Sequence, residues 1–232
     1  MGALIGGLFK MSMGPFQIKD CALVVRMADV PPAYNLRELY DRVRSCLPDS
    51  IYHHFCETPL RATFDDPAFR NDFAVWSHRA LNDDILAERL GILDPYDFGD
   101  IEELRQIVLD IIDDRLSEIT HVPWAKSGQE LHFLQALTVI FDTGRRIEDP
   151  VELPQAISQM TTSSLYYHFL EARRRVEGRL DDFTAWLQDW NDRGKPLIES
   201  FSVVDFYFLS LRELQTELSH ATDQVLKGIL MC

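Results

Sequence analysis

The sequence is poor in cysteine and lacks the spacings that mark common cysteine sites. Its 232 residues include four cysteines, and no two of them form a C-x-x-C pair. A zinc or redox site built on that spacing is therefore excluded, and nothing suggests a disulfide framework. We expect free thiols in a reducing cytoplasm.

Basic residues are outnumbered by acidic ones, and long apolar runs are absent. The chain carries 23 basic and 37 acidic residues, so its formal net charge is −14. Such a balance repels nucleic acid phosphates and anionic membrane surfaces. The apolar run near the N-terminus is too short to span a bilayer and lacks the flanks of a signal peptide. We therefore expect an acidic, soluble protein that binds neither nucleic acid nor membrane.

The sequence does contain an internal repeat. Residues 50–57 read SIYHHFCE, and residues 164–171 read SLYYHFLE. A shift of 114 places residues 22–61 on residues 136–175, with 11 of 40 positions identical. Beyond a longer loop in the first half, Asp-Phe-x-x-Trp also recurs. This agreement predicts that the chain is a tandem duplication.

The boundaries of the two copies follow from this alignment. We assign residues 1–14 to a loose tail and residues 15–120 to the first repeat. Residues 121–130, which contain Pro and Gly, form a linker, and residues 131–232 form the second repeat. Because each copy has more apolar stripes than a small helical cluster would bury, we expect the two copies to share one core.

The periodicity of most segments is helical. The last helix expected in each copy carries an apolar stripe at helical spacing, and each copy opens with a short apolar stretch, residues 21–27 and 135–141. These stretches are too short to tell a strand from a buried helix. The predicted fold is mainly α. It has two tandem copies of a helical module, with room for one short strand in each, packed about a pseudo-twofold axis.

Local capping signals account for several of the repeated polar residues. Asn35 precedes Glu38 by three positions, and Asp149 precedes Glu152 in the same way, which is the capping-box pattern. Ser50 and Ser164 are predicted to be N-caps of the octapeptide helices. A nucleophilic serine is the alternative, but no glycine-rich elbow surrounds either one.

One polar stripe in each copy is the candidate functional site. On a helical wheel, His, Glu and Arg at spacings of three and four lie beside a buried arc, while His53 points away. A nearby Asp of each copy is the expected partner of the histidine. The candidate binding residues are His54, Glu57, Arg61, Asp72, His168, Glu171, Arg175 and Asp182. Pro59 is expected to interrupt the first stripe before Arg61.

The stripe has four interpretations. The residues can organise packing alone, with each histidine bonded to a neighbouring Asp. They can form a recognition site for a small polar ligand or a partner's peptide. Two H-x-x-E helices with two Asp side chains can hold a dinuclear metal centre, although the nearby Arg opposes a cation. General acid–base catalysis without metal is the fourth.

The motifs together resemble those of a known family. NLREL, SIYHHFCETPL, RNDFAVW, LAERLGILDP and SSLYYHFLEARRR are similar to segments of an uncharacterised, internally duplicated bacterial family, catalogued as a domain of unknown function. The resemblance extends from about residue 16 to residue 228. It implies no established activity.

The sequence as a whole favours a non-enzymatic binding or regulatory protein. Its expected partner is a small polar ligand or another protein, and no cofactor is expected. The alternative is an enzyme that uses the repeated His, Glu and Asp positions, with or without a divalent metal. The sequence leaves the oligomeric state open.

Overall fold

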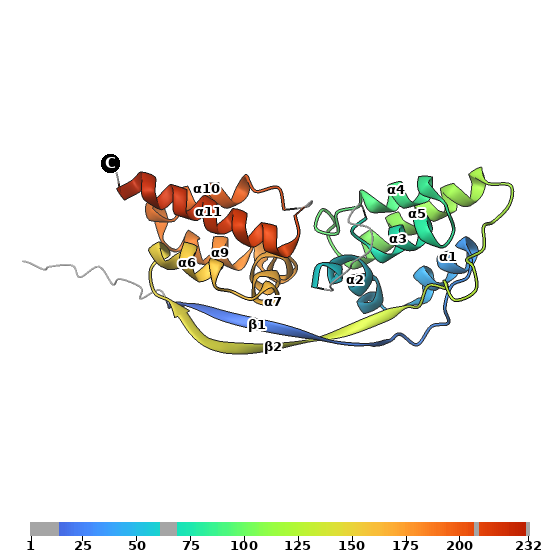
Figure 1. Ribbon diagram of the computed structural model, residues 1–232, viewed down its shortest axis with the longest axis horizontal. Coiled ribbons are helices and arrows are strands. Elements are labelled where there is room, and N and C mark those ends of the chain that lie inside the picture. Colours follow the sequence, from blue (N-terminus) through green and yellow to red (C-terminus); the bar gives the residue numbers. More distant parts are fainter. Residues whose placement is uncertain (1–13, 61–68, 207–208, 231–232) are drawn as a thin grey trace, which may run out of the picture.

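Two helical lobes lie side by side along one face of a two-stranded ribbon in the computed structural model (Figure 1). The structure describes residues 14–60, 69–206 and 209–230. Most of these residues are helical, so the prediction of a mainly α fold is confirmed. None of the helices in these ranges is long and apolar enough to cross a membrane.

Each lobe is made by the helices of one half of the sequence. The first lobe contains α1 (Leu36–Ser45), α2 (Pro48–Cys56), the 3₁₀ turn η1 (Thr58–Leu60), α3 (Asp72–Arg79), α4 (Asp84–Gly91) and α5 (Ile101–Glu118). The second contains η2 (Pro150–Glu152), α6 (Leu153–Ser158), α7 (Thr162–Leu165), the π-helix η3 (Tyr166–Glu171), α8 (Ala172–Arg175), η4 (Glu177–Arg179), α9 (Asp182–Gln188), η5 (Asn191–Arg193), α10 (Lys195–Ser202) and α11 (Leu211–Leu230).

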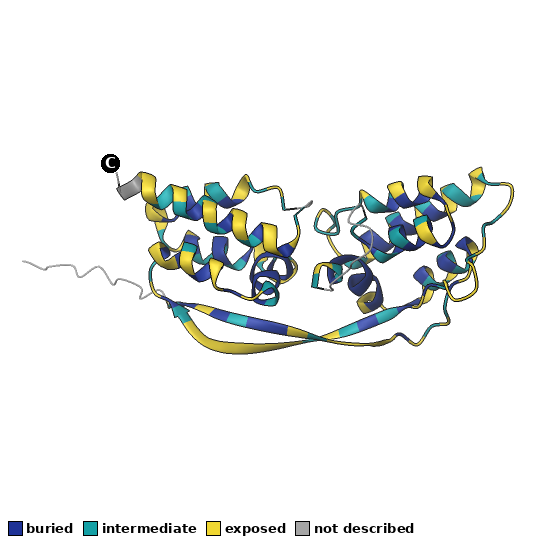
Figure 2. Cartoon of the chain, in the orientation of Figure 1, coloured by how far each residue is buried: buried dark blue, intermediate teal, exposed yellow. Residues whose placement is uncertain are grey.

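The ribbon consists of the two apolar stretches whose structure the sequence left open. Strand β1 (Phe16–Met27) has 12 residues and pairs antiparallel with β2 (Leu134–Ile147), which has 14. Both are longer than the short strands expected. Twelve residues in a strand span about 40 Å, which is why the ribbon reaches both lobes. Figure 2 shows β2 exposed over most of its length.

The buried apolar side chains form two clusters, one in each lobe. The expectation of one shared core is therefore wrong. The first cluster includes Leu131 and Phe133, which lead into β2, and the second includes Phe16, Ile18 and Cys21 of β1. Each lobe is thus completed by chain from the other half of the sequence, because the strands cross between the lobes.

The helix starts confirm one capping prediction and correct another. The Asn35 side chain accepts a hydrogen bond from the Glu38 amide at 3.0 Å, and a capping box joins Asp149 and Glu152. The serines of the octapeptides are not N-caps. Helix α2 already begins at Pro48, which favours the first helical position, and Thr161 caps α7. Both serine hydroxyls are therefore free to bond elsewhere.

Candidate functional site

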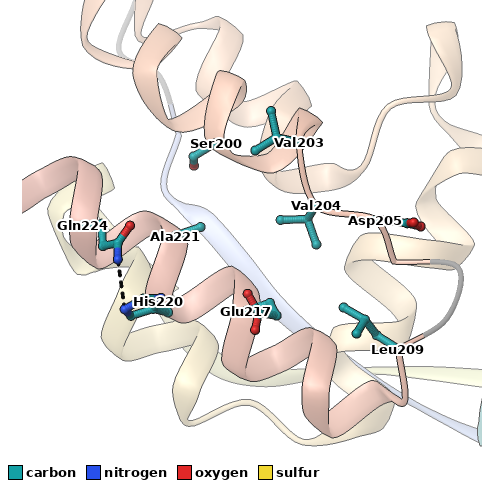
Figure 3. A pocket seen from close by; sticks show the side chains of 9 residues that line it. All are labelled: Ser200, Val203, Val204, Asp205, Leu209, Glu217, His220, Ala221 and Gln224. Atoms are coloured by element: carbon teal, nitrogen blue, oxygen red, sulfur yellow. Dashed lines mark hydrogen bonds between the residues drawn. The ribbon is translucent and has the colours of Figure 1, made fainter.

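Two open hollows lie along α11, and the residues predicted from the sequence line neither of them. One, of about 330 Å³, lies between α10 and α11 (Figure 3), where His220 is hydrogen-bonded to Gln224 at 3.1 Å. The other, of about 770 Å³, lies between α6 and α11 and shares His220. No sequence motif marks either hollow; the walls of the first come from the consecutive helices α10 and α11, and those of the second from α6 and α11, which are far apart in the chain.

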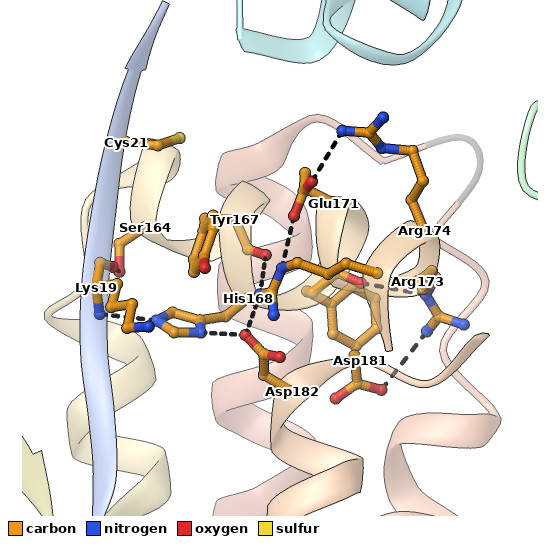
Figure 4. A network of polar contacts seen from close by, with 12 residues as sticks. Lys19, Cys21, Ser164, Tyr167, His168, Glu171, Arg173, Arg174, Asp181 and Asp182 are labelled. Atoms are coloured by element: carbon orange, nitrogen blue, oxygen red, sulfur yellow. Dashed lines mark hydrogen bonds and ion pairs between the residues drawn. The ribbon is translucent and has the colours of Figure 1, made fainter. Parts of the chain in front are cut away.

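The predicted residues of the second half lie instead where the helices meet β1 (Figure 4). The Ser164 hydroxyl donates a hydrogen bond to the Lys19 carbonyl at 2.6 Å, and the Lys19 amide donates to His168 Nε2 at 2.9 Å. One serine and one histidine, four positions apart, thus bind both backbone groups of a single strand residue, as a neighbouring strand would. We call this pair a Ser–His clamp.

The first half contains the same clamp on the other strand. The Ser50 hydroxyl donates to the Leu134 carbonyl at 2.7 Å, and the Leu134 amide donates to His54 Nε2 at 3.0 Å. Leu134 begins β2, just as Lys19 lies near the start of β1. The repeated Ser and His of the octapeptide therefore hold the starts of the two strands.

An aspartate fixes the tautomer of each clamp histidine. Because Nε2 accepts a backbone N–H, it carries no proton, and Nδ1 is left to donate. His168 Nδ1 lies 2.7 Å from Asp182, and His54 Nδ1 lies 2.5 Å from Asp72. The two histidines are 2% and 1% exposed. Both nitrogens of each ring are thus engaged within the protein, which leaves no lone pair for a metal ion or a substrate proton.

The second half brings its four predicted residues into one network. Arg175 contacts Asp182 through Nη2 and Glu171 through Nε, the latter at 2.7 Å, and its guanidinium lies 4.2 Å from the centre of the Tyr167 ring. These residues are on or next to the π-helix, a form often found at functional positions. Burial raises the pKa of the Asp182 carboxyl, but hydrogen bonds from His168 and Arg175 outweigh it and lower the pKa overall.

The first half is arranged differently, and its network includes His53 instead of His54 as the partner of Glu57. The His53 side chain is fully buried, because β2 lies against α2, so the expectation that it points away is wrong. His53 Nδ1 bonds Glu57 at 2.7 Å, and Thr138 of β2 also donates to Glu57 at 3.2 Å. Among the described residues, none forms a hydrogen bond with His53 Nε2. Arg61 lies outside the described residues.

A tyrosine pair joins the two lobes above the middle of the ribbon. The hydroxyls of Tyr52 and Tyr166 are 3.2 Å apart, and the Arg174 guanidinium lies 4.2 Å from the centre of the Tyr52 ring. Burial raises the pKa of both phenols far above the usual value, so both remain neutral hydroxyls that can share a hydrogen bond. The lobes are therefore linked by side chains as well as by the strands.

The buried cysteine of β1 is not an activated nucleophile. Cys21 contacts the Ser163 carbonyl at 3.4 Å, and burial, aided by the Asp20 charge, raises the pKa of its thiol to about 12. A thiol needs a lowered pKa to react as thiolate near neutral pH. In the part of the chain that the structure describes, no three His, Cys, Asp or Glu side chains form a group that could hold a metal ion.

We expect Asp182→Asn to lower the free energy of unfolding by about 1.5–3 kcal/mol near neutral pH, since the carboxylate accepts two charge-assisted bonds. The native pKa of Asp182 is depressed, so its stabilisation is fully present above the unfolded pKa of about 3.9 and is lost as pH falls through the native value. Urea unfolding of parent and variant from neutral to acidic pH should show the difference shrinking in acid.

The exposed pair of Asp192 and Lys195 supplies the control for that comparison. Asp192→Asn should change the free energy of unfolding little at any pH, because surface pairs contribute little. A difference between parent and Asp182→Asn that stays constant down to the lowest pH would rule out the stabilising role of the carboxylate.

Comparison with known proteins finds one family and one structure. The model of a family of unknown function, DUF5752, matches residues 13–223. The sequence has no match among the curated proteins. The structure of OrfY from Thermoproteus tenax superposes with a TM-score of 0.75 at 24% sequence identity, covering 92% of this chain and 96% of that one. At this identity the likeness concerns the fold alone.

Proposed function

We propose a non-enzymatic role for this chain, which belongs to DUF5752, a family of unknown function. In this role the middle of the ribbon binds a partner protein. The observation that carries the proposal is an exposed apolar face on the ribbon. It consists of Val24, Leu137, Val139 and Phe141, which are 57%, 68%, 44% and 48% exposed. We call these four residues the outer patch.

Val24, Leu137 and Val139 of the outer patch face away from the lobes. Thr138 bonds Glu57 and Cys21 contacts the Ser163 carbonyl, so these two ribbon side chains point toward the lobes. Side chains alternate along a strand, and directly paired residues share a face. Val24 and Leu137 are paired and lie at intervening positions, so they point to the opposite side.

The composition of the patch supports a protein partner rather than a small polar ligand. Residues 21–25 and 136–141 contain no charged side chain in a chain whose net charge is −14. Four large apolar side chains expose an area on the order of a few hundred Å², and a contiguous patch of that size marks an interaction site in many proteins. A sugar or phosphate would find few hydrogen-bond partners there.

The predicted site residues have a different role in this proposal. His54, Asp72, His168 and Asp182 act as positioning residues, since their hydrogen bonds fix the ends of the strands. Glu171 and Arg175 hold Asp182 in place. This role favours binding over the enzymatic alternative, because the histidine nitrogens are already used.

We also propose that the two halves are copies related by a pseudo-twofold axis. Three observations support it. The Ser–His clamp of each half binds the strand of the other half. Tyr52 and Tyr166 are 114 residues apart, and their hydroxyls touch. Leu23 pairs with Thr138 at a nearly equal separation in the sequence. The copies would then exchange strands, with each clamp holding the strand of the other copy.

A photo-crosslinking amino acid tests the proposed binding surface. It is placed at Val139 in the outer patch and, as the matched control, at Val203, which is 80% exposed on the second lobe. Illumination of cells that express each form should give a discrete crosslinked protein at position 139 only. Adding Leu137→Asp should abolish that product. Equal products at both positions, or none at position 139, would refute the proposal.

A further inference from the structure

We infer that the partner of the ribbon is a second copy of this chain, which pairs its own β2 edge to edge with β2 and makes a four-stranded sheet. This inference rests on the proposed function, because it places the partner on the edge of β2 beside the outer patch.

The orientation of the backbone follows from the clamps. The N–H and C=O of Lys19 and Leu134 are bound by side chains, so they point away from the paired strand. In an antiparallel ladder such outward-facing residues alternate with inward-facing ones. The backbone groups of Ala136, Thr138 and Ile140 therefore point outward along the free edge of β2.

The two ends of the ribbon are protected, whereas no described residue binds the backbone along the middle of the β2 edge. The clamps cover the backbone at the start of each strand, and the Asp20 side chain accepts from the Cys21 amide on the β1 edge. Residues 136–141 contain no Lys, Pro or Gly, the devices that normally block strand addition. Instead they combine high β-propensity with zero charge, which is typical of segments that pair with other strands.

Another strand fits the exposed middle of the β2 edge best. A two-stranded ribbon is marginal by itself, and three or more strands give a more stable sheet. Two β2 edges can pair antiparallel about a twofold axis near Thr138, which makes the contact self-complementary, as a symmetric dimer requires. The nearest charged side chain of β2, Asp142, is already held by Arg146 at 2.6 Å. The acidic chain thus presents neutral surface where two copies would meet.

The size of the contact predicts its strength. Edge pairing over residues 136–141 joins one short segment from each copy, so it buries well below the roughly 800 Å² per partner of a standard stable interface. We therefore expect a reversible dimer in the micromolar range.

Sedimentation velocity across the micromolar range tests the inference on the full chain. The parent should shift from monomer to dimer with rising concentration. Ile140→Lys should weaken association at least about tenfold, because lysine on an edge opposes pairing. Ile92→Lys is the matched control, since Ile92 is 77% exposed on the first lobe, away from the ribbon, and this variant should associate as the parent does.

Amide hydrogen exchange distinguishes edge pairing from packing of the outer patches. Protection of the Thr138 and Ile140 amides should rise with concentration, while that of Val139, whose N–H points inward to Ala22, should not change.

A parent that stays monomeric, or a dimer that survives Ile140→Lys unchanged, would overturn the inference. If the parent is monomeric and position 139 still crosslinks another protein, the proposed function stands and only the second copy is refuted; if nothing crosslinks there, both fail.

Discussion

Residues 15–120, the proposed first copy, should not fold when they are expressed alone. This fragment lacks Leu131 and Phe133, which are buried in the first cluster, and it lacks Leu134, the strand residue that Ser50 and His54 bind. Deleting one buried Phe and one buried Leu typically costs about 3–5 and 2–5 kcal/mol. The sum is comparable to the whole stability of a domain, about 5–15 kcal/mol. Circular dichroism should show little helix and no cooperative melting.

A fragment of nearly equal length supplies the control. Residues 28–136 contain the whole first cluster and the complete clamp on Leu134, and they omit Phe16 and Ile18, which belong to the second lobe. This fragment should be helical and should melt cooperatively. The opposite result, in which residues 15–120 melt cooperatively as a monomer and residues 28–136 do not, would contradict the account. It would mean that the first lobe folds without residues 131–134.

His168→Ala should lower the free energy of unfolding by about 3–5 kcal/mol. The change leaves the Lys19 amide without its acceptor and Asp182 without one of its donors, both in partly buried surroundings. It also removes a ring that packs against Phe16, with ring centroids 4.9 Å apart. His168→Gln can keep one of the two hydrogen bonds, so it should lose less. Urea unfolding at neutral pH measures both variants.

His78 offers a matched histidine–aspartate pair without a clamp. Its Nδ1 lies 2.6 Å from Asp84, but the side chain is half exposed and binds no strand. His78→Ala should therefore cost less than about 1 kcal/mol. If His168→Ala and His78→Ala have the same small effect, the histidine does not hold the strand, and the repeated octapeptide needs another explanation.

The helices could be predicted because their signals are local. The caps at Asn35 and Asp149 each depend on residues three positions apart, and both are present. The stripe of α5 is likewise buried at Leu104, Val108 and Ile112. Such patterns carry their own geometry, so a single sequence is enough to place them.

The contacts between each half and the strand of the other half could not be predicted, because they join residues that are far apart in the sequence. Ser50 is 84 residues from Leu134, and Ser164 is 145 residues from Lys19. In the sequence, Ser and His four positions apart look like a helix cap and a helix border. Only the position of the strand shows that both side chains bind one backbone unit.

The candidate site was predicted more closely in the second half than in the first. The wheel grouped His168 with Glu171 and Arg175, and the three share one network through Asp182 and the helix backbone. In the first half Glu57 pairs with His53 instead of His54. The wheel assigned His53 to the outer side of the helix because the sequence gives no sign that β2 covers that side.

The most direct test of the clamp is a scalar coupling across its hydrogen bond. In isotope-labelled protein, NMR should detect coupling between the Lys19 amide nitrogen and His168 Nε2, and between the Leu134 amide nitrogen and His54 Nε2. Nitrogen shifts should show a protonated Nδ1 and an unprotonated Nε2 in both rings. A protonated Nε2, or no coupling together with rapid exchange of the Lys19 amide, would contradict the account that each half holds the strand of the other.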